Sequence, residues 1–236
     1  MRRFCSLICS VLLITGLLTL STDALAQVPQ TNIRMNFGIW DMPDKDVGIS
    51  VTHTDLGRNE RFTNVEVSGI SGAFAFSHMI SPRFAWELSV GGFTDTETEA
   101  LQEVVDSRYF DDHYETIYSF THAVSVSYIT MGLIYYPMYE LQDSLGGVDS
   151  FLRPYLTAGI GPYFGWDSRW DDDDLTDADF VSTMGAYPGI GLDVLLSRHF
   201  IFNVDLRYHL VEFGEPLKGT EDFSGLNVMA GFKVAF

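Results

Sequence analysis

The last eleven residues, Leu226 to Phe236, constrain the fold of this chain more than any other stretch. Two kinds of side chain alternate along it, large apolar ones and small or polar ones. One parity holds Leu226, Val228, Ala230, Phe232, Val234 and Phe236, and the other holds Asn227, Met229, Gly231, Lys233 and Ala235. A period of two is typical of a β-strand with two different faces. A tilted strand needs about 9–11 residues to cross a bilayer, so this stretch has the length of a transmembrane strand.

The position of this strand, at the very end of the chain, is also informative. An apolar strand left at the edge of a soluble sheet invites aggregation. A membrane barrel avoids that problem because closure pairs the last strand with the first. The terminal strand therefore favours a closed barrel.

Seven other segments repeat the alternation, which predicts eight strands in all. They are 33–41, 70–80, 83–93, 122–136, 152–166, 186–196 and 200–210. The register of 122–136 is left open, because its alternation blurs after Ile129. We therefore predict an all-β fold, an eight-stranded antiparallel up-and-down transmembrane β-barrel.

Alternation alone does not say which face meets solvent, since a soluble lipocalin-like barrel alternates too. A water-facing strand surface is normally rich in Lys and Glu, yet the chain has only three lysines, Lys45, Lys218 and Lys233. The second face instead holds Gly, Ala, Ser, Asn and Tyr with a few charges. Small and polar residues suit a narrow lumen, and large apolar residues suit lipid.

The connections between the predicted strands alternate between long and short. Long ones span 42–69, 94–121, 167–183 and 211–225. Membrane barrels have short periplasmic turns and longer external loops, so both termini are expected in the periplasm of a Gram-negative cell and the barrel in its outer membrane. Residues 47–54 could add a strand, which leaves ten strands as an alternative, although an extension of the first hairpin is favoured.

The N-terminus has the pattern of a secretory signal peptide, predicted to cover residues 1–26. Arg2 and Arg3 precede an apolar run, and Ala24-Leu25-Ala26 resembles a cleavage site. A retained anchor is the alternative. The barrel domain is expected to cover 27–236, and both cysteines, Cys5 and Cys9, lie in the predicted signal, so disulfides are not expected in that domain.

The net charge of the chain limits the classes of molecule that it can bind. The net charge of −18 argues against nucleic acid, because phosphate binding needs a basic surface. Acidic residues concentrate in 95–115 and 167–179, which we predict to be solvated external loops. Asp171, Asp172, Asp173 and Asp174 are weak candidates for a divalent cation, since carboxylates are hard oxygen ligands. The alternative is a self-repelling loop without metal.

The predicted lumen face carries several charged side chains. They are Arg34, Arg83, Glu87, Arg153, Asp193, Asp205, Arg207, His209 and Lys233. Such residues could line an ion pathway. A salt-bridge network that plugs the barrel is the favoured interpretation, because buried charges must be paired and a barrel of eight strands holds little beyond its side chains.

At this point the chain resembles the small eight-stranded outer-membrane barrels, of the OmpX-like, OmpW-like and OmpA transmembrane-domain kinds. The resemblance rests on Arg153 to Gly161 and on the terminal Gly231-Phe-Lys-Val-Ala-Phe236. The latter resembles the signal read by the barrel-assembly machinery, with Gly231 and Phe236 well placed, although Val234 stands where an aromatic residue is usual. The resemblance implies contact with outer-membrane lipid and lipopolysaccharide, and a monomer is expected.

Three classes of function remain open at the level of sequence. The first is a structural or surface-interaction protein that acts through its external loops. The second is a narrow channel for small or hydrophobic solutes, as in OmpW-like proteins. The third is an enzyme that modifies lipid A, for which His122, given lipid-facing parity, and Ser168 are the only pair of candidates, without an orienting carboxylate. Nothing in the sequence predicts a cofactor.

Overall fold

A computed structural model describes residues 31–42, 47–57, 60–106, 113–137, 152–171, 174–197, 199–217 and 219–236. All the secondary structure in these ranges is β. The strands are β1 (Thr31–Asp41), β2 (Gly48–Asp55), β3 (Glu60–Ser81), β4 (Phe84–Asp106), β5 (His113–Tyr135), β6 (Leu152–Asp171), β7 (Asp174–Leu195), β8 (Phe200–His209), β9 (Glu212–Leu217), β10 (Thr220–Asp222) and β11 (Gly225–Ala235). None of the described residues forms a helix long and apolar enough to span a membrane. The predicted signal peptide, 1–26, lies outside the described residues.

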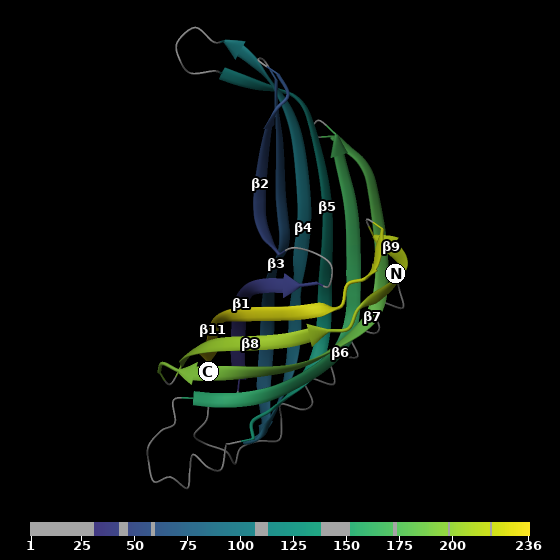
Figure 1. The fold of residues 1–236 in the computed structure, drawn as a ribbon. Coiled ribbons are helices and arrows are strands. Elements are labelled where there is room, and N and C mark those ends of the chain that lie inside the picture. Colours follow the sequence, from purple (N-terminus) through teal and green to yellow (C-terminus); the bar gives the residue numbers. More distant parts are fainter. Residues whose placement is uncertain are drawn as a thin grey trace.

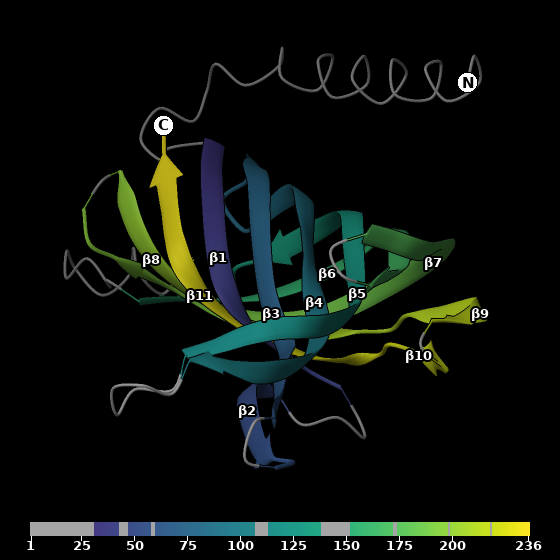
Figure 2. The ribbon, with the colours of Figure 1, turned by 90° about the horizontal axis from the view of Figure 1, so that it is seen from above.

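Eight of the strands in the described ranges close into an antiparallel barrel, in the order β1-β3-β4-β5-β6-β7-β8-β11 and back to β1. The closing pair runs from Asn32 opposite Ala235 to Asp41 opposite Leu226. At its end, the amide of Phe236 donates to the carbonyl of Thr31 at 3.0 Å. Figure 2 shows β8, β11, β1 and β3 side by side along one part of this ring. The predicted fold class, including the closing role of the terminal strand, is confirmed.

The first hairpin explains why the barrel has eight strands and not ten. Within the described residues β2 pairs only with β3, where it continues the line of β1 beyond residues 42–47. Opposite the interruption, β3 contains a bulge between Val67 and Ile70, and Gly69 there has a φ of +71°, which glycine adopts readily. β2 and the part of β3 that pairs with it therefore extend the first hairpin above the barrel.

The predicted loops 94–121 and 167–183 are largely wrong, because the strands continue through them. β4 reaches Asp106, β5 begins at His113, and β6 reaches Asp171. The acidic stretch that starts at Thr94 reads Thr-Asp-Thr-Glu-Thr-Glu, which alternates hydroxyls with carboxylates. The pattern has the period of two of a β-strand, but both kinds of residue are polar. A search for alternating apolar and polar residues therefore does not find it. Figure 1 shows β2–β5 rising well past β1, β8 and β11 as a tall wall.

The directions of the faces agree with a membrane barrel. On β1, Met35 and Phe37 are 55% and 64% exposed, whereas Arg34 and Asn36, which alternate with them, are buried. On β5 the even-numbered residues point inward, so Val124 and Val126 are buried, and Ile129 and Leu133 face outward. Large apolar side chains thus cover the outside of the barrel wall, as in transmembrane barrels, while the lumen holds polar side chains together with a buried apolar cluster that includes Val124 and Val126.

Tyrosines and glycines fit together inside the narrow lumen. A Cβ atom added to Gly159 would lie 2.6 Å from the ring of Tyr187, and one added to Gly185 would lie 2.6 Å from the ring of Tyr163. Both rings are fully buried. The absence of a side chain at each glycine therefore makes the space that a neighbouring ring occupies, and the interior is packed by side chains as expected for eight strands.

This packing predicts that Gly159→Ala destabilises the barrel by about 1–3 kcal/mol, the usual effect of overpacking. The added methyl group must displace the ring of Tyr187. The measurement is equilibrium unfolding in urea of the protein refolded into lipid vesicles. Gly214→Ala is the matched control, because a Cβ there meets nothing within 4 Å. Equal stabilities for the two variants would contradict the packing described.

Candidate functional site

Four charged side chains form a ring of alternating sign in the lumen. Arg34 Nη2 lies 2.8 Å from Glu87 Oε2, and Arg34 Nη1 lies 2.9 Å from Asp205 Oδ2. Arg207 Nη2 completes the ring at 2.7 Å from Glu87 Oε1 and 2.8 Å from Asp205 Oδ2. All four side chains are at most 3% exposed.

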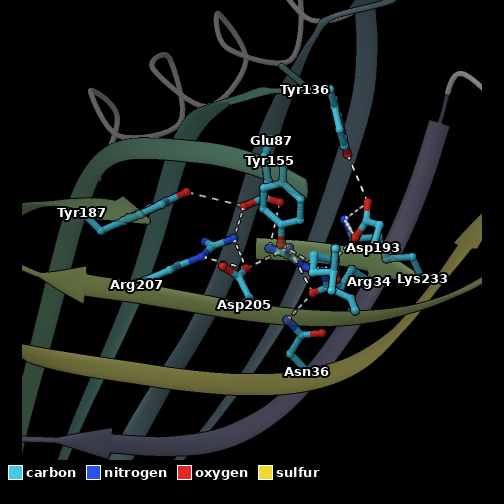
Figure 3. A network of polar contacts seen from close by, with 12 residues as sticks. Arg34, Asn36, Glu87, Tyr136, Tyr155, Tyr187, Asp193, Asp205, Arg207 and Lys233 are labelled. Carbon is cyan, nitrogen blue, oxygen red and sulfur yellow. Dashed lines mark hydrogen bonds and ion pairs between the residues drawn. The ribbon is translucent and has the colours of Figure 1, made fainter. Parts of the chain in front are cut away.

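The ring bridges the barrel from wall to wall, as Figure 3 shows. Glu87 belongs to β4 and Arg207 to β8, and these strands stand opposite each other in the closed order of eight. Their contact of 2.7 Å therefore crosses the lumen. Opposite sides of the wall are held together by charge-assisted hydrogen bonds, which are the stronger kind.

A second ion pair lies beside the ring. Lys233 Nζ is 2.6 Å from Asp193 Oδ1, and Asn203 donates to the same carboxylate at 2.8 Å. Asn203 also donates to the hydroxyl of Tyr155 at 2.9 Å, and that hydroxyl accepts from Arg34 at 3.2 Å. The two groups of charges therefore form one connected network, which we call the ionic layer.

The ionic layer is electrically balanced. Its three bases and three acids are Arg34, Arg207, Lys233, Glu87, Asp193 and Asp205. An isolated buried charge is strongly unfavourable, so pairing of every member is what permits such burial. A balanced network leaves no net charge to attract a permeating ion.

An apolar layer covers the ionic layer toward the tall wall. Trp40 stacks on His209 with ring centroids 4.3 Å apart and packs on Phe93 at 4.4 Å, while Tyr163 Oη lies 2.7 Å from His209 Nδ1. The β9–β10 hairpin adds buried side chains to this layer. They are Phe213, Leu217 and, just beyond β10, Phe223. Ions and aromatic groups thus close the lumen in two successive layers.

Three residues predicted for the lumen lie outside the ionic layer. Arg83 is half-buried in the turn before β4, and Arg153 is half-buried at the start of β6, opposite Asp193 in the sheet register. His209 is fully buried but belongs to the apolar layer. The structure therefore brings together six of the nine predicted residues, from β1, β4, β7, β8 and β11.

The pair proposed for lipid A chemistry is wrong. His122 points into the barrel and is buried, so it lacks lipid-facing parity, whereas Ser168 lies on the outward face of β6, beside Ala123. The inward direction follows from the register of β5 with β4, which is unbroken from Phe84 to Leu101 and places His122 opposite Glu97. His122 Nε2 instead contacts Asp167 Oδ1, a buried carboxylate.

The remaining predicted sites are the acidic residues 171–174 and the two residues of the assembly signal, Gly231 and Phe236. Asp171 ends β6 and Asp174 begins β7, while Asp172 and Asp173 lie outside the described residues. Among the described side chains no three His, Cys, Asp or Glu residues come together to hold a metal ion. Gly231 lies against the backbone of Met35 and Asn36, and Phe236 is exposed at the end of β11.

Sequence reasoning missed the neutral members of the network. Asn203, Tyr155 and Tyr187 hold the charges in place, with Tyr187 under Arg207 at 4.5 Å from the ring centre. Along their strands, all three alternate in step with charged residues that face the lumen, or pair with such residues on the next strand. The sequence therefore does indicate that they face the lumen. What it lacks is the register that decides which of them meet.

Comparisons with known proteins find only distant structural similarity. No protein-family model matches the chain, and no curated protein matches it in sequence. Three similar solved structures are OprG from Pseudomonas aeruginosa (19% identity, 89% of this chain and 97% of that one, TM-score 0.45), Neisserial surface protein A (11%, 87% and 97%, 0.49) and the N-terminal barrel domain of OprF from Pseudomonas aeruginosa (12%, 89% and 100%, 0.42). The first and third are described as outer-membrane protein and β-barrel domain.

The ring of charges predicts that Arg207→Met destabilises the protein by about 3–5 kcal/mol, because removing one partner leaves buried carboxylates without their cation. Arg61→Met, at the upper end of β3, is the control and is expected to change stability by less than about 0.5 kcal/mol. Urea unfolding in vesicles measures both. A small effect of Arg207→Met would mean that the ring does not support the fold.

Proposed function

We propose that this chain is an outer-membrane β-barrel protein with a closed lumen, which acts as a structural or surface-interaction protein. Its termini lie in the periplasm, and the tall wall with its acidic segments stands outside the cell. The observation that carries the proposal is the ionic layer, in which Glu87 and Arg207 meet across the barrel at 2.7 Å.

The apolar belt supports the location. Around the barrel, outward side chains such as Phe74, Val90, Leu156 and Phe232 are exposed and apolar. A soluble protein seldom exposes an apolar surface that encircles it, whereas lipid solvates such a surface favourably. The short turns at 82–83 and 196–199 lie at the same end as Thr31 and Phe236, which fits a periplasmic end.

Among the described residues, the orientation places most of the exposed acidic side chains on the extracellular side. Exposed carboxylates there include Glu66, Asp179, Glu215 and Glu221. Partners with basic or cation-bridged surfaces are favoured by such a rim, and polyanions are disfavoured. Lipid, lipopolysaccharide and the assembly machinery remain the expected contacts of the barrel itself, with Gly231 and Phe236 as the expected assembly signal. Divalent cations at Asp171–Asp174 remain a hypothesis.

A second candidate is an entry route for hydrophobic solutes. β7 and β8 are paired from Gly189 to Leu195, and above them only Ala186 and Leu210 form an isolated bridge. Leu217 of β9 packs at this level against Gly165 and Val181, on the inner faces of β6 and β7. Displacing β9 would open the apolar layer to the side. The ionic layer below it still opposes passage through the whole barrel.

The closed lumen predicts that the refolded protein gives no sustained single-channel conductance in a planar bilayer. The double variant Glu87→Ala with Arg207→Ala removes the contact across the lumen and is expected to raise the frequency of openings. Glu60→Ala with Arg61→Ala, which removes the same charges at the tip of β3, serves as its control. Sustained conductance of the unaltered protein would contradict a closed lumen and favour the channel.

A further inference from the structure

An uncharged face lies above the apolar belt on the outside of β4–β7, bordered on β2 and β3 by the outward Asp55 and Arg61. It comprises the even-numbered positions 94–100 of β4, the odd-numbered positions 119–125 of β5, the even-numbered positions 164–170 of β6 and 178–182 of β7. The inward positions of the same strands include Asp95, Glu97, Asp167 and Arg169. The chain as a whole has a net charge of −18, so an uncharged face is not what its overall composition would produce.

Hydroxyl groups cover one half of this face. Thr94 Oγ1 lies 3.2 Å from Ser125 Oγ, and Thr98 Oγ1 lies 3.1 Å from Thr121 Oγ1, so they form rows across β4 and β5. A hydroxyl offers one donor and two acceptor positions, so each row retains capacity for an outside partner. Water-facing strands usually carry Lys and Glu, which protect a sheet from association, and this face has neither.

Aromatic rings cover the other half. Trp166 and Phe180 pack with ring centroids 5.4 Å apart and remain 38% and 57% exposed. The register places Ser125 directly beside Trp166, so hydroxyls and rings form one continuous surface. Aromatic enrichment together with depletion of charge is the composition of a binding interface.

The position of the face indicates its occupant. Val90 and Ile129 of the apolar belt lie two outward positions below Thr94 and Ser125, on the same side of β4 and β5. The seven residues 94–100 of tilted strand rise about 18 Å. In a leaflet made of glycolipid, the layer immediately above the acyl chains is saccharide. Phosphate does not suit this face, since no Lys or Arg lies on it.

We infer that this face is a contact surface for the neutral saccharides of glycolipid in the outer leaflet. Sugar hydroxyls exchange hydrogen bonds with the rows of Thr and Ser, and the apolar faces of sugar rings lie on Trp166 and Phe180. The inference rests on the proposed outer-membrane location and adds the chemical class of the lipid that surrounds the wall. The acidic inner side of the wall takes no part in it.

Protection of single cysteines tests the inference. The full chain, with Cys5→Ser and Cys9→Ser, receives Thr96→Cys on the outer face or Ser50→Cys on the inner side. Ser50 is exposed and pairs with Glu66, and Glu66 pairs with Glu97. Since Glu97 follows Thr96, the two cysteine positions lie at the same level along the barrel axis. The rate of reaction with a membrane-impermeant maleimide is measured in vesicles whose glycolipid carries a complete neutral oligosaccharide or only its innermost sugars.

The expected result is a several-fold lower ratio of the Thr96→Cys rate to the Ser50→Cys rate with the complete oligosaccharide. An unchanged ratio would overturn the inference. Two other outcomes would also overturn it, by naming another occupant. A ratio that falls when free oligosaccharide is added to the truncated vesicles indicates a soluble glycan, and a ratio that falls with protein density in both vesicles indicates a second copy of the chain.

Leu88→Cys in the apolar belt separates the inference from the proposed function. It is expected to be protected in both kinds of vesicle, because Leu88 faces lipid. Rapid reaction of Leu88→Cys would contradict the membrane location and the inference with it. Protection of Leu88→Cys with an unchanged ratio would contradict the saccharide contact alone.

Discussion

The structure depends on one electrostatic constraint, the need of every charge in a narrow lumen to find a partner. Arg34, Glu87, Asp205 and Arg207 satisfy it as a ring of alternating sign whose contacts are 2.7–2.9 Å long. Since Glu87 and Arg207 come from opposite strands, the same contacts that neutralise the charges also tie opposite sides of the barrel together. Closure of the lumen and support of the wall are therefore two results of a single network.

The other parts of the interior follow from this ring. Asn203 and Tyr155 join it to the Lys233–Asp193 pair, and the tyrosine rings occupy the space that glycines leave free. Above, Trp40 and His209 begin an apolar layer that the β9–β10 hairpin completes. A molecule that crossed the barrel would have to break paired charges and displace packed rings. This arrangement is the support for the closed lumen proposed above.

The sequence predicts the barrel well, because its strands contrast large apolar residues with small or polar ones. The terminal strand at Leu226–Phe236 pairs with β1 as expected, and the strand at Ile33–Asp41 has the expected faces. The upper wall escapes prediction because Thr94–Glu99 alternates two kinds of polar residue, which no hydrophobic pattern reveals. Apolar parity predicts the wrong side for His122, because Val124 and Val126, which share its parity, pack inside the barrel. Pairing across the lumen, such as Glu87 with Arg207, needs the closed geometry.

The central claim is that Glu87 and Arg207 interact directly across the barrel, and a double-mutant cycle tests it most directly. The free energies of unfolding in vesicles are compared for the unaltered chain, Glu87→Gln, Arg207→Gln and the double variant. We expect a coupling energy of about 1–3 kcal/mol, because the double variant no longer leaves either charge without its partner. A coupling energy of zero, with the two single effects simply adding, would contradict the account.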